Sequence, residues 1–67
     1  MTAAQFELLD EAQAQRILSW RFDGLTEAGY DASDALVLAT RVEVDLHLAT
    51  NLLKHGCPVS TALRILL

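Results

Sequence analysis

The sequence is poor in the residues that interrupt helices, since its 67 residues include one proline and three glycines. Neither residue type occurs before Gly24, so a long helix can begin near the N-terminus. The single cysteine, Cys57, excludes an internal disulfide and favours a reducing, cytoplasmic location. No apolar run approaches the roughly 18 residues that span a bilayer. The first residues carry acids where a signal peptide needs basic residues, so we expect no membrane association.

Positive charge is also scarce, because nine acidic residues face five basic ones and the net charge is −4. Residues 1–34 hold seven of the acids and two arginines. Proteins that bind nucleic acid use clustered cations to neutralise phosphates, and this sequence has no such cluster. We therefore do not expect a nucleic-acid partner. A helix-turn-helix DNA reader is kept as the alternative because the predicted helices are short, with Arg41, Lys54 and Arg64 as its cations.

Apolar residues, in contrast, are abundant at 52% of the chain. A chain of this length forms one domain and buries only roughly 60% of the surface that its unfolded form exposes. The surplus of apolar side chains must then be covered by something else. We therefore expect one domain over residues 1–67 that acts as a small protein-interaction or adaptor module, binding another protein or a second copy of itself.

The first half of the sequence predicts a long helix. Thr2 and Gln5 form a capping box, and strong helix formers predict one helix from Ala3 to about Asp23. The helix could continue to Ala28 or break at Gly24. At about 100° per residue it has two apolar stripes. One contains Phe6, Leu9, Ile17, Trp20 and Ala28, and the other contains Leu8, Leu18, Phe22 and Leu25.

Two interpretations of these stripes stay open. A break at Gly24 would let both stripes reach one core. Alternatively, the first stripe is a partner or dimer surface built on Phe6, Leu9 and Trp20. Tryptophan is enriched where binding energy concentrates, although a core position for Trp20 is also expected.

Three shorter helices are predicted after Gly29, at residues 32–41, 46–55 and 59–67. Asp31 and Asp45 are the expected N-caps, while Gly29 and Gly56 end the preceding helices in left-handed conformation. The predicted inward residues are Ala35, Leu36, Leu38, Ala39 and Val42, then Leu46, Ala49, Leu52 and Leu53. In the last helix the apolar residues are Ala62, Leu63, Ile65 and Leu66. An offset of 27 residues relates Leu25 to Leu52 and Gly29 to Gly56, which suggests one helix-turn-helix unit used twice.

The segment from Leu25 to Leu53 resembles the ubiquitin-associated (UBA) domain. The matching features are the turn Gly29-Tyr30, the cap Asp31, the pair Ala35-Leu36, the start Asp45-Leu46, Ala49 and the closing pair Leu52-Leu53. The resemblance implies an all-α fold, a small orthogonal helical bundle with a three-helix core at 25–53. An N-terminal helix at 1–24 and a C-terminal turn and helix at 56–67 would be added to that core.

The resemblance also implies a protein-binding surface. Carried over, its residues are Ala28, Gly29, Tyr30, Leu52 and Leu53, and a ubiquitin-like protein becomes a further candidate partner. Ala28 stands where the family often has methionine, and the last helix follows Leu52-Leu53 directly.

No pattern of catalytic or metal-binding residues is present. His47 and His55 lie eight residues apart, whereas a helical metal site favours ligands three or four apart. Cys57 follows Gly56 in a turn, where a small buried hydrophobe is the commoner role than a reactive thiol. The sequence has no glycine-rich phosphate loop and no paired acid and base. We therefore expect no enzyme, no metal, no cofactor and no small-molecule ligand.

Overall fold

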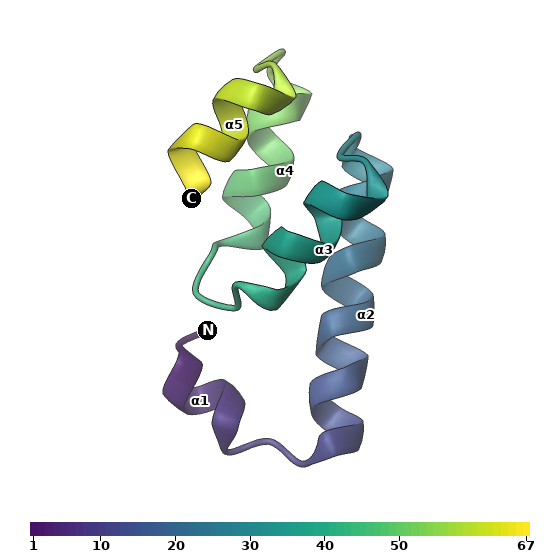
Figure 1. The fold of residues 1–67 in the computed structure, drawn as a ribbon, viewed down its shortest axis with the longest axis vertical. Coiled ribbons are helices and arrows are strands. Elements are labelled where there is room, and N and C mark those ends of the chain that lie inside the picture. The colour runs from purple at the N-terminus through teal and green to yellow at the C-terminus, as the bar shows by residue number, and fades with distance from the viewer.

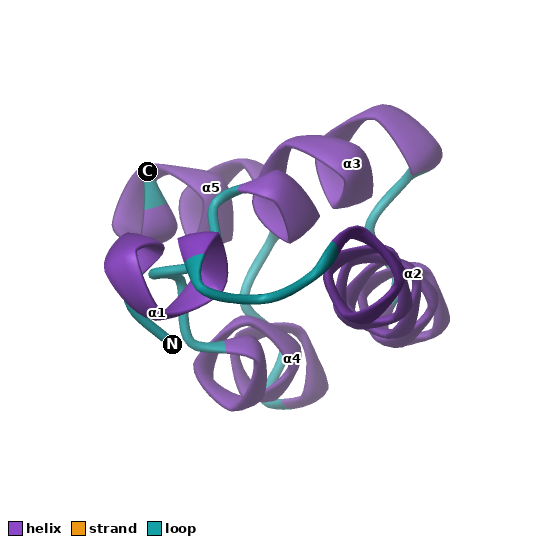
Figure 2. Ribbon diagram, turned by 90° about the horizontal axis from the view of Figure 1, so that it is seen from below, coloured by secondary structure: helices purple, strands orange, loops and turns teal.

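Five helices and no strands make up the computed structural model, which describes all 67 residues (Figure 1). The helices are α1 (Ala3–Glu7), α2 (Glu11–Ala28), α3 (Ala32–Thr40), α4 (Leu46–Lys54) and α5 (Val59–Leu66). The all-α small bundle expected from the sequence is confirmed. Helix α3 lies across the long helix α2, α4 packs against α2 as well, and α5 returns along α4 (Figure 2).

The prediction of one long helix from Ala3 to Asp23 is wrong. Helix α1 ends at Glu7, and a second capping box starts α2, in which the Asp10 carboxylate accepts from the Gln13 N–H at 2.8 Å. The first capping box, at Thr2 and Gln5, is present as predicted. An aspartate side chain can accept hydrogen bonds from nearby backbone N–H groups, which favours a helix start over a helix interior. At Asp10 this preference starts a new helix despite the strong helix formers on either side.

Helix α2 runs through Gly24 without a break and continues to Ala28. Of the two alternatives, the structure thus agrees with continuation to Ala28, and the chain breaks at residues 8–10, where no break was predicted. A Cβ added at Gly24 would lie 3.8 Å from Leu46 Cδ2, which is ordinary van der Waals contact. The absence of a side chain at Gly24 is thus not required by close packing of α4.

Two equivalent turns reverse the chain after α2 and after α4. Gly29 has φ +123° and Gly56 has φ +88°, as predicted for residues that end a helix in left-handed conformation. The N–H that follows each glycine donates to the carbonyl five residues back, from Tyr30 to Leu25 and from Cys57 to Leu52. The predicted 27-residue repeat is confirmed in these hydrogen bonds.

Aspartates start the next two helices, as predicted. The Asp31 carboxylate accepts from the Asp34 N–H at 2.8 Å, and Asp45 accepts from His47 N–H at 2.8 Å. The Asp34 N–H and the Ser33 hydroxyl lower the pKa of Asp31, because both stabilise its charged form.

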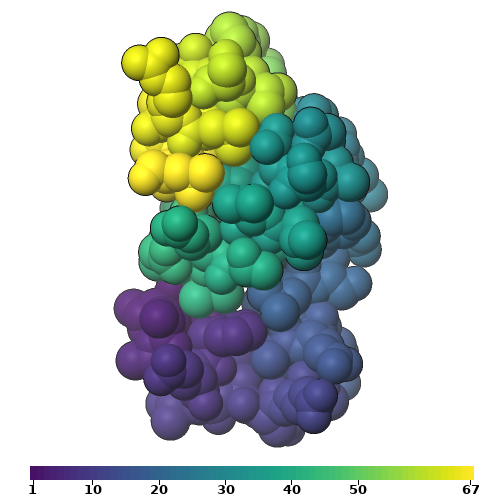
Figure 3. Space-filling view, in the orientation of Figure 1, coloured from purple at the N-terminus to yellow at the C-terminus, as the bar shows by residue number.

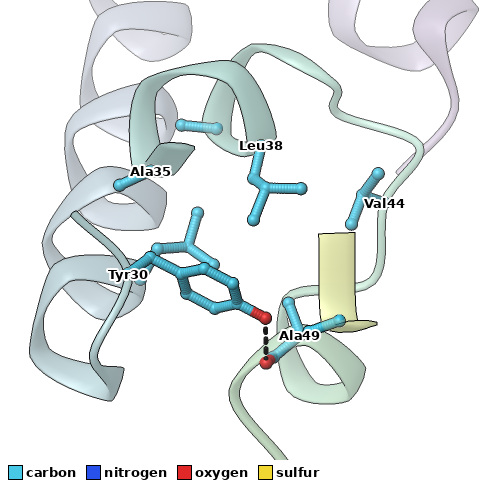
Figure 4. Close-up of a cluster of buried hydrophobic side chains, with 8 residues drawn as sticks. Tyr30, Ala35, Leu38, Val44 and Ala49 are labelled. Atoms are coloured by element: carbon cyan, nitrogen blue, oxygen red, sulfur yellow. Dashed lines mark hydrogen bonds between the residues drawn. The ribbon is translucent and has the colours of Figure 1, made fainter. Parts of the chain in front are cut away.

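The core lies where α2, α3, α4 and α5 meet. Its buried residues are Leu25, Tyr30, Ala35, Leu38, Ala39, Val44, Ala49 and Ala62 (Figure 4). The predicted inward position of Leu36 is wrong, because its side chain is 58% exposed on the outer face of α3. Ile65, for which no inward position was predicted, is exposed on α5. Leu46, Leu52 and Leu53 are half-buried and pack against the core.

The molecule is elongated, with extents of 36 × 19 × 17 Å. The space-filling view shows α1 and the first turns of α2 forming one end and α5 lying toward the other (Figure 3). Only ten of the 67 residues are buried, so most apolar side chains keep some contact with solvent. No helix combines the length and apolar character that crossing a membrane requires.

Candidate interaction surface

Arg21 is the one charged side chain in the interior, and it links α2 to the end of α3 and the loop beyond. Its guanidinium donates to four carbonyl oxygens, those of Leu38 (3.1 Å), Ala39 (3.2 Å), Arg41 (3.1 Å) and Val44 (2.9 Å). The last carbonyls of a helix lack intrahelical donors, so Arg21 supplies donors where α3 ends. The 41–45 segment is thereby held against α2.

The environment of Arg21 is electrostatically mixed. Burial lowers the pKa of its guanidinium, while the carboxylates of Glu43 and Asp45 act to raise it. Both carboxylates therefore lie near enough to Arg21 to favour its charged form. The loop that Arg21 holds in place carries these two acids on the outside of the molecule.

A hollow of about 480 Å³ lies between the N-terminus, α2 and this loop. Its apolar lining comprises Met1, Ile17, Trp20, Val42, Val44 and Leu46, and its polar lining comprises Arg21, Glu43, Asp45 and His47. The α3–α4 connection thus lines the hollow with alternating apolar and polar residues, and α2 contributes Ile17, Trp20 and Arg21.

A second, shallower hollow of about 290 Å³ lies on the opposite side of Trp20. It is lined by Leu9, Gln13, Arg16, Ile17 and Trp20. Because Ile17 and Trp20 line both hollows, their side chains form the ridge that separates them. We call the ridge and its two hollows the Trp20 surface.

Trp20 itself is 61% exposed, so its own chain leaves most of the indole uncovered. Of the other first-stripe residues, Leu9 joins Trp20 in the shallower hollow, while Phe6 is half-buried and lines neither hollow. Leu8, from the second stripe, is 87% exposed in the break between α1 and α2. Burying a large apolar side chain contributes roughly 1.5–3 kcal/mol, so the Trp20 surface offers binding energy that folding does not use.

The residues expected from the UBA resemblance lie near one another at the other end of α2. A Cβ added at Gly29 would lie 3.5 Å from Leu53 Cδ1, so the turn and α4 are in contact there. Ala28, Leu52 and Leu53 are half-buried against the core. Tyr30 is only 3% exposed, and its hydroxyl donates to the Ala49 carbonyl at 2.8 Å (Figure 4). Its ring is therefore part of the hydrophobic core and is not available on the surface.

A third hollow, of about 490 Å³, lies along α4 and the turn after it. Leu48, Asn51, Leu52, His55, Gly56 and Cys57 line it. The Cys57 thiol is half-buried and contacts the Pro58 carbonyl at 3.6 Å, and His55 Nδ1 lies 2.9 Å from the Asn51 carbonyl. No three His, Cys, Asp or Glu side chains gather closely enough to hold a metal ion.

Sequence reasoning missed Arg21 and the loop that completes the hollow between the N-terminus and α2. Arg21 entered the sequence analysis only as one of the two arginines in residues 1–34, although it lies between Leu18 and Leu25 on the inner stripe of α2. A single charge at the i+3 position of an apolar stripe is a signal that could have identified it. The loop residues gave no such signal, because their place beside Trp20 depends on tertiary structure.

Comparison with protein-family models, curated proteins and solved structures found no match to this chain.

Proposed function

We propose that this chain is a small protein-interaction module that binds a protein partner, or a second copy of itself, through the Trp20 surface. The observation that carries the proposal is the exposed indole of Trp20 between two hollows in a protein with few buried residues. Exposed apolar surface rimmed by polar residues is typical of protein-binding sites. Tryptophan in such a position commonly dominates binding energy.

The fold supports this proposal by ordering the Trp20 surface in the absence of a partner. Arg21 fixes the loop that forms one wall, and the α2 backbone fixes the ridge. A binding site that is already ordered loses less conformational entropy on association. Binding, with no catalytic step, is the activity that these features support.

Isolation of partners from the native host tests this proposal. The wild-type chain, Trp20→Glu and Leu36→Glu should be compared, since Leu36 is also exposed but lies on α3, outside the Trp20 surface. We expect wild type and Leu36→Glu to retain the same specific protein, or a second copy of the chain, and Trp20→Glu to lose it. Equal retention by all three chains would contradict the proposal.

A second candidate function comes from the UBA resemblance, namely binding of a ubiquitin-like protein at residues 28–30 and 52–53. The contact between Gly29 and Leu53 favours it, because it brings the two segments of that surface together. A titration with ubiquitin followed by amide chemical shifts tests it. Shifts at Ala28, Gly29 and Leu53 are expected, whereas shifts confined to Trp20 and its neighbours would assign binding to the Trp20 surface instead.

A further inference from the structure

Helix α1 and the two residues after it form no hydrogen bond with the other helices. The side-chain bonds of this segment join Thr2 to Gln5. Its backbone bonds also stay within it, the last being from the Leu9 N–H to the Phe6 carbonyl at 3.1 Å. No residue of α1 is buried. Partial burial of apolar side chains is therefore all that holds α1 against its neighbours.

These apolar contacts are few. Met1 lines the hollow between the N-terminus and α2 but stays 50% exposed, and Leu9 lines the shallower hollow. Phe6 is half-buried. A helix of five residues is too short to be stable on its own, and the entropy lost when its backbone is ordered opposes docking. The docking of α1 is thus a balance of small opposing terms.

The other four helices contain the whole hydrophobic core, whose residues lie between Leu25 and Ala62. Asp10 and Gln13 cap the start of α2 with their own side chains, and the Asp10 N–H donates to Gln13 Oε1 at 3.3 Å. Helix α2 therefore keeps its cap whether or not α1 is docked. Leu8, at the joint between the two helices, is 87% exposed, so its side chain does not fix the angle between them.

From these features we infer that α1 is a lid on the Trp20 surface, which opens about residues 8–10 while α2 to α5 stay folded. Figure 3 shows the closed state, in which α1 lies against the first turns of α2. Opening withdraws Met1 from the hollow that Val44 and Leu46 also line. Local opening of weakly held segments is common in folded proteins. The opening itself rests on contacts within the chain, whereas its effect on access for a partner rests on the proposed function.

Amide hydrogen exchange of the full wild-type chain tests the opening. The hydrogen-bonded amides of Phe6, Leu8 and Leu9 should exchange at least about tenfold faster, relative to an unstructured peptide, than the Tyr30 amide, which donates to Leu25 in the core. Equal protection of the two groups would overturn the inference, because α1 would then open only when the whole fold unfolds.

Two variants test whether α1 covers the hollow. Phe6→Glu places a charge at a half-buried position of α1, and Leu8→Glu makes the same change where the side chain is already exposed. In amide spectra of the full chain, Phe6→Glu should shift the signals of Val44, Leu46 and the Trp20 indole. Phe6→Leu should move them part of the way along the same line, because fast exchange averages the closed and open states. Leu8→Glu should keep the wild-type positions.

The remaining outcomes are also decisive. Unchanged Val44 and Leu46 signals in Phe6→Glu would show that α1 does not cover the hollow. Loss of the core signals in that variant would show that α1 belongs to the same folding unit as α2 to α5, and either result overturns the lid. If exchange and shifts are as expected but wild type and Trp20→Glu retain the same proteins, the lid stands and the proposed function fails.

Discussion

At the scale of single residues, we expect substitution of Arg21 to lower the free energy of unfolding strongly. Arg21→Met would keep much of the apolar stem but leave four carbonyl oxygens without the guanidinium. The Leu38 and Arg41 carbonyls also accept from the backbone N–H groups of Arg41 and Val44, so the carbonyls of Ala39 and Val44 are the two left without a donor. A buried acceptor without a donor costs about 1–3 kcal/mol, and water can offset part of that cost. We expect a net loss of about 3 kcal/mol in the free energy of unfolding, measured by urea denaturation.

Arg21→Lys is the matched control, because it keeps the positive charge but cannot reproduce the planar set of donors. It should fall between wild type and Arg21→Met. A Met variant as stable as wild type would mean that the four hydrogen bonds contribute nothing net. The same variants should also loosen the 41–45 loop, which backbone amide exchange can follow.

Tyr30 gives the molecule a defined response to alkaline pH. Burial raises the pKa of its phenol, and the nearby Cys57 adds to that shift. Because the folded-state pKa lies above the unfolded value of about 10, the stabilising contribution is fully present below that pH. It is lost as pH rises through the folded-state pKa, since the ionised oxygen can no longer donate to Ala49.

The measurement is the free energy of unfolding in urea between pH 9 and pH 11 or above. Wild type should lose stability across this range, and Tyr30→Phe should lose less because it has no proton to release. Below pH 9 the Phe variant should be less stable by about 1 kcal/mol, the net value of one hydrogen bond. Parallel pH curves for the two proteins would contradict the assignment to Tyr30.

At the scale of helices, the glycines divide into one that the fold tolerates and two that it requires. Gly24 lies inside α2 with normal helical geometry and room for a methyl group. Gly24→Ala should therefore stabilise the protein by about 0.5–1 kcal/mol, through the higher helix propensity of alanine. Gly56→Ala is the control, because open space surrounds it but its φ of +88° opposes a side chain. It should destabilise by about 1 kcal/mol. Thermal or urea unfolding measures both, and a destabilised Gly24→Ala would show that contact with Leu46 prevails.

The helices also show which structural features can be predicted from neighbouring residues in the sequence. Caps and turn glycines predicted α3, α4 and α5 to within one residue at each end, because the signals at Asp31, Asp45 and Gly56 act on neighbouring backbone. The same rule, applied to Asp10 and Gln13, would have located the break between α1 and α2. Within α3, Leu36 was misplaced because only the tertiary packing decides which apolar side chains of a short helix face the core.

The candidate site was less predictable than the helices for a physical reason. An unpaired apolar stripe on α2 indicated that Trp20 could be exposed, and its exposure in the structure agrees with that alternative. The acids beside it come from a loop more than 20 residues away in the chain. Their position depends on Arg21 bonding to the Arg41 and Val44 carbonyls, and no local pattern encodes that contact.

At the scale of the whole molecule, few buried side chains imply that association and folding are linked. The largest fully buried side chains are Leu25 and Leu38, so a single copy has a small margin of stability. If the folded chain pairs through the Trp20 surface, mass action adds to that margin. The apparent free energy of unfolding should then rise by about 1.4 kcal/mol per mole of dimer for each tenfold increase in protein concentration, and the urea midpoint should rise with it. Trp20→Glu should show a lower midpoint that does not change with concentration, because its unfolding no longer includes dissociation. A wild-type midpoint that stays constant over a hundredfold range would show that one copy is stable alone, and its apolar surface would then be free for another partner.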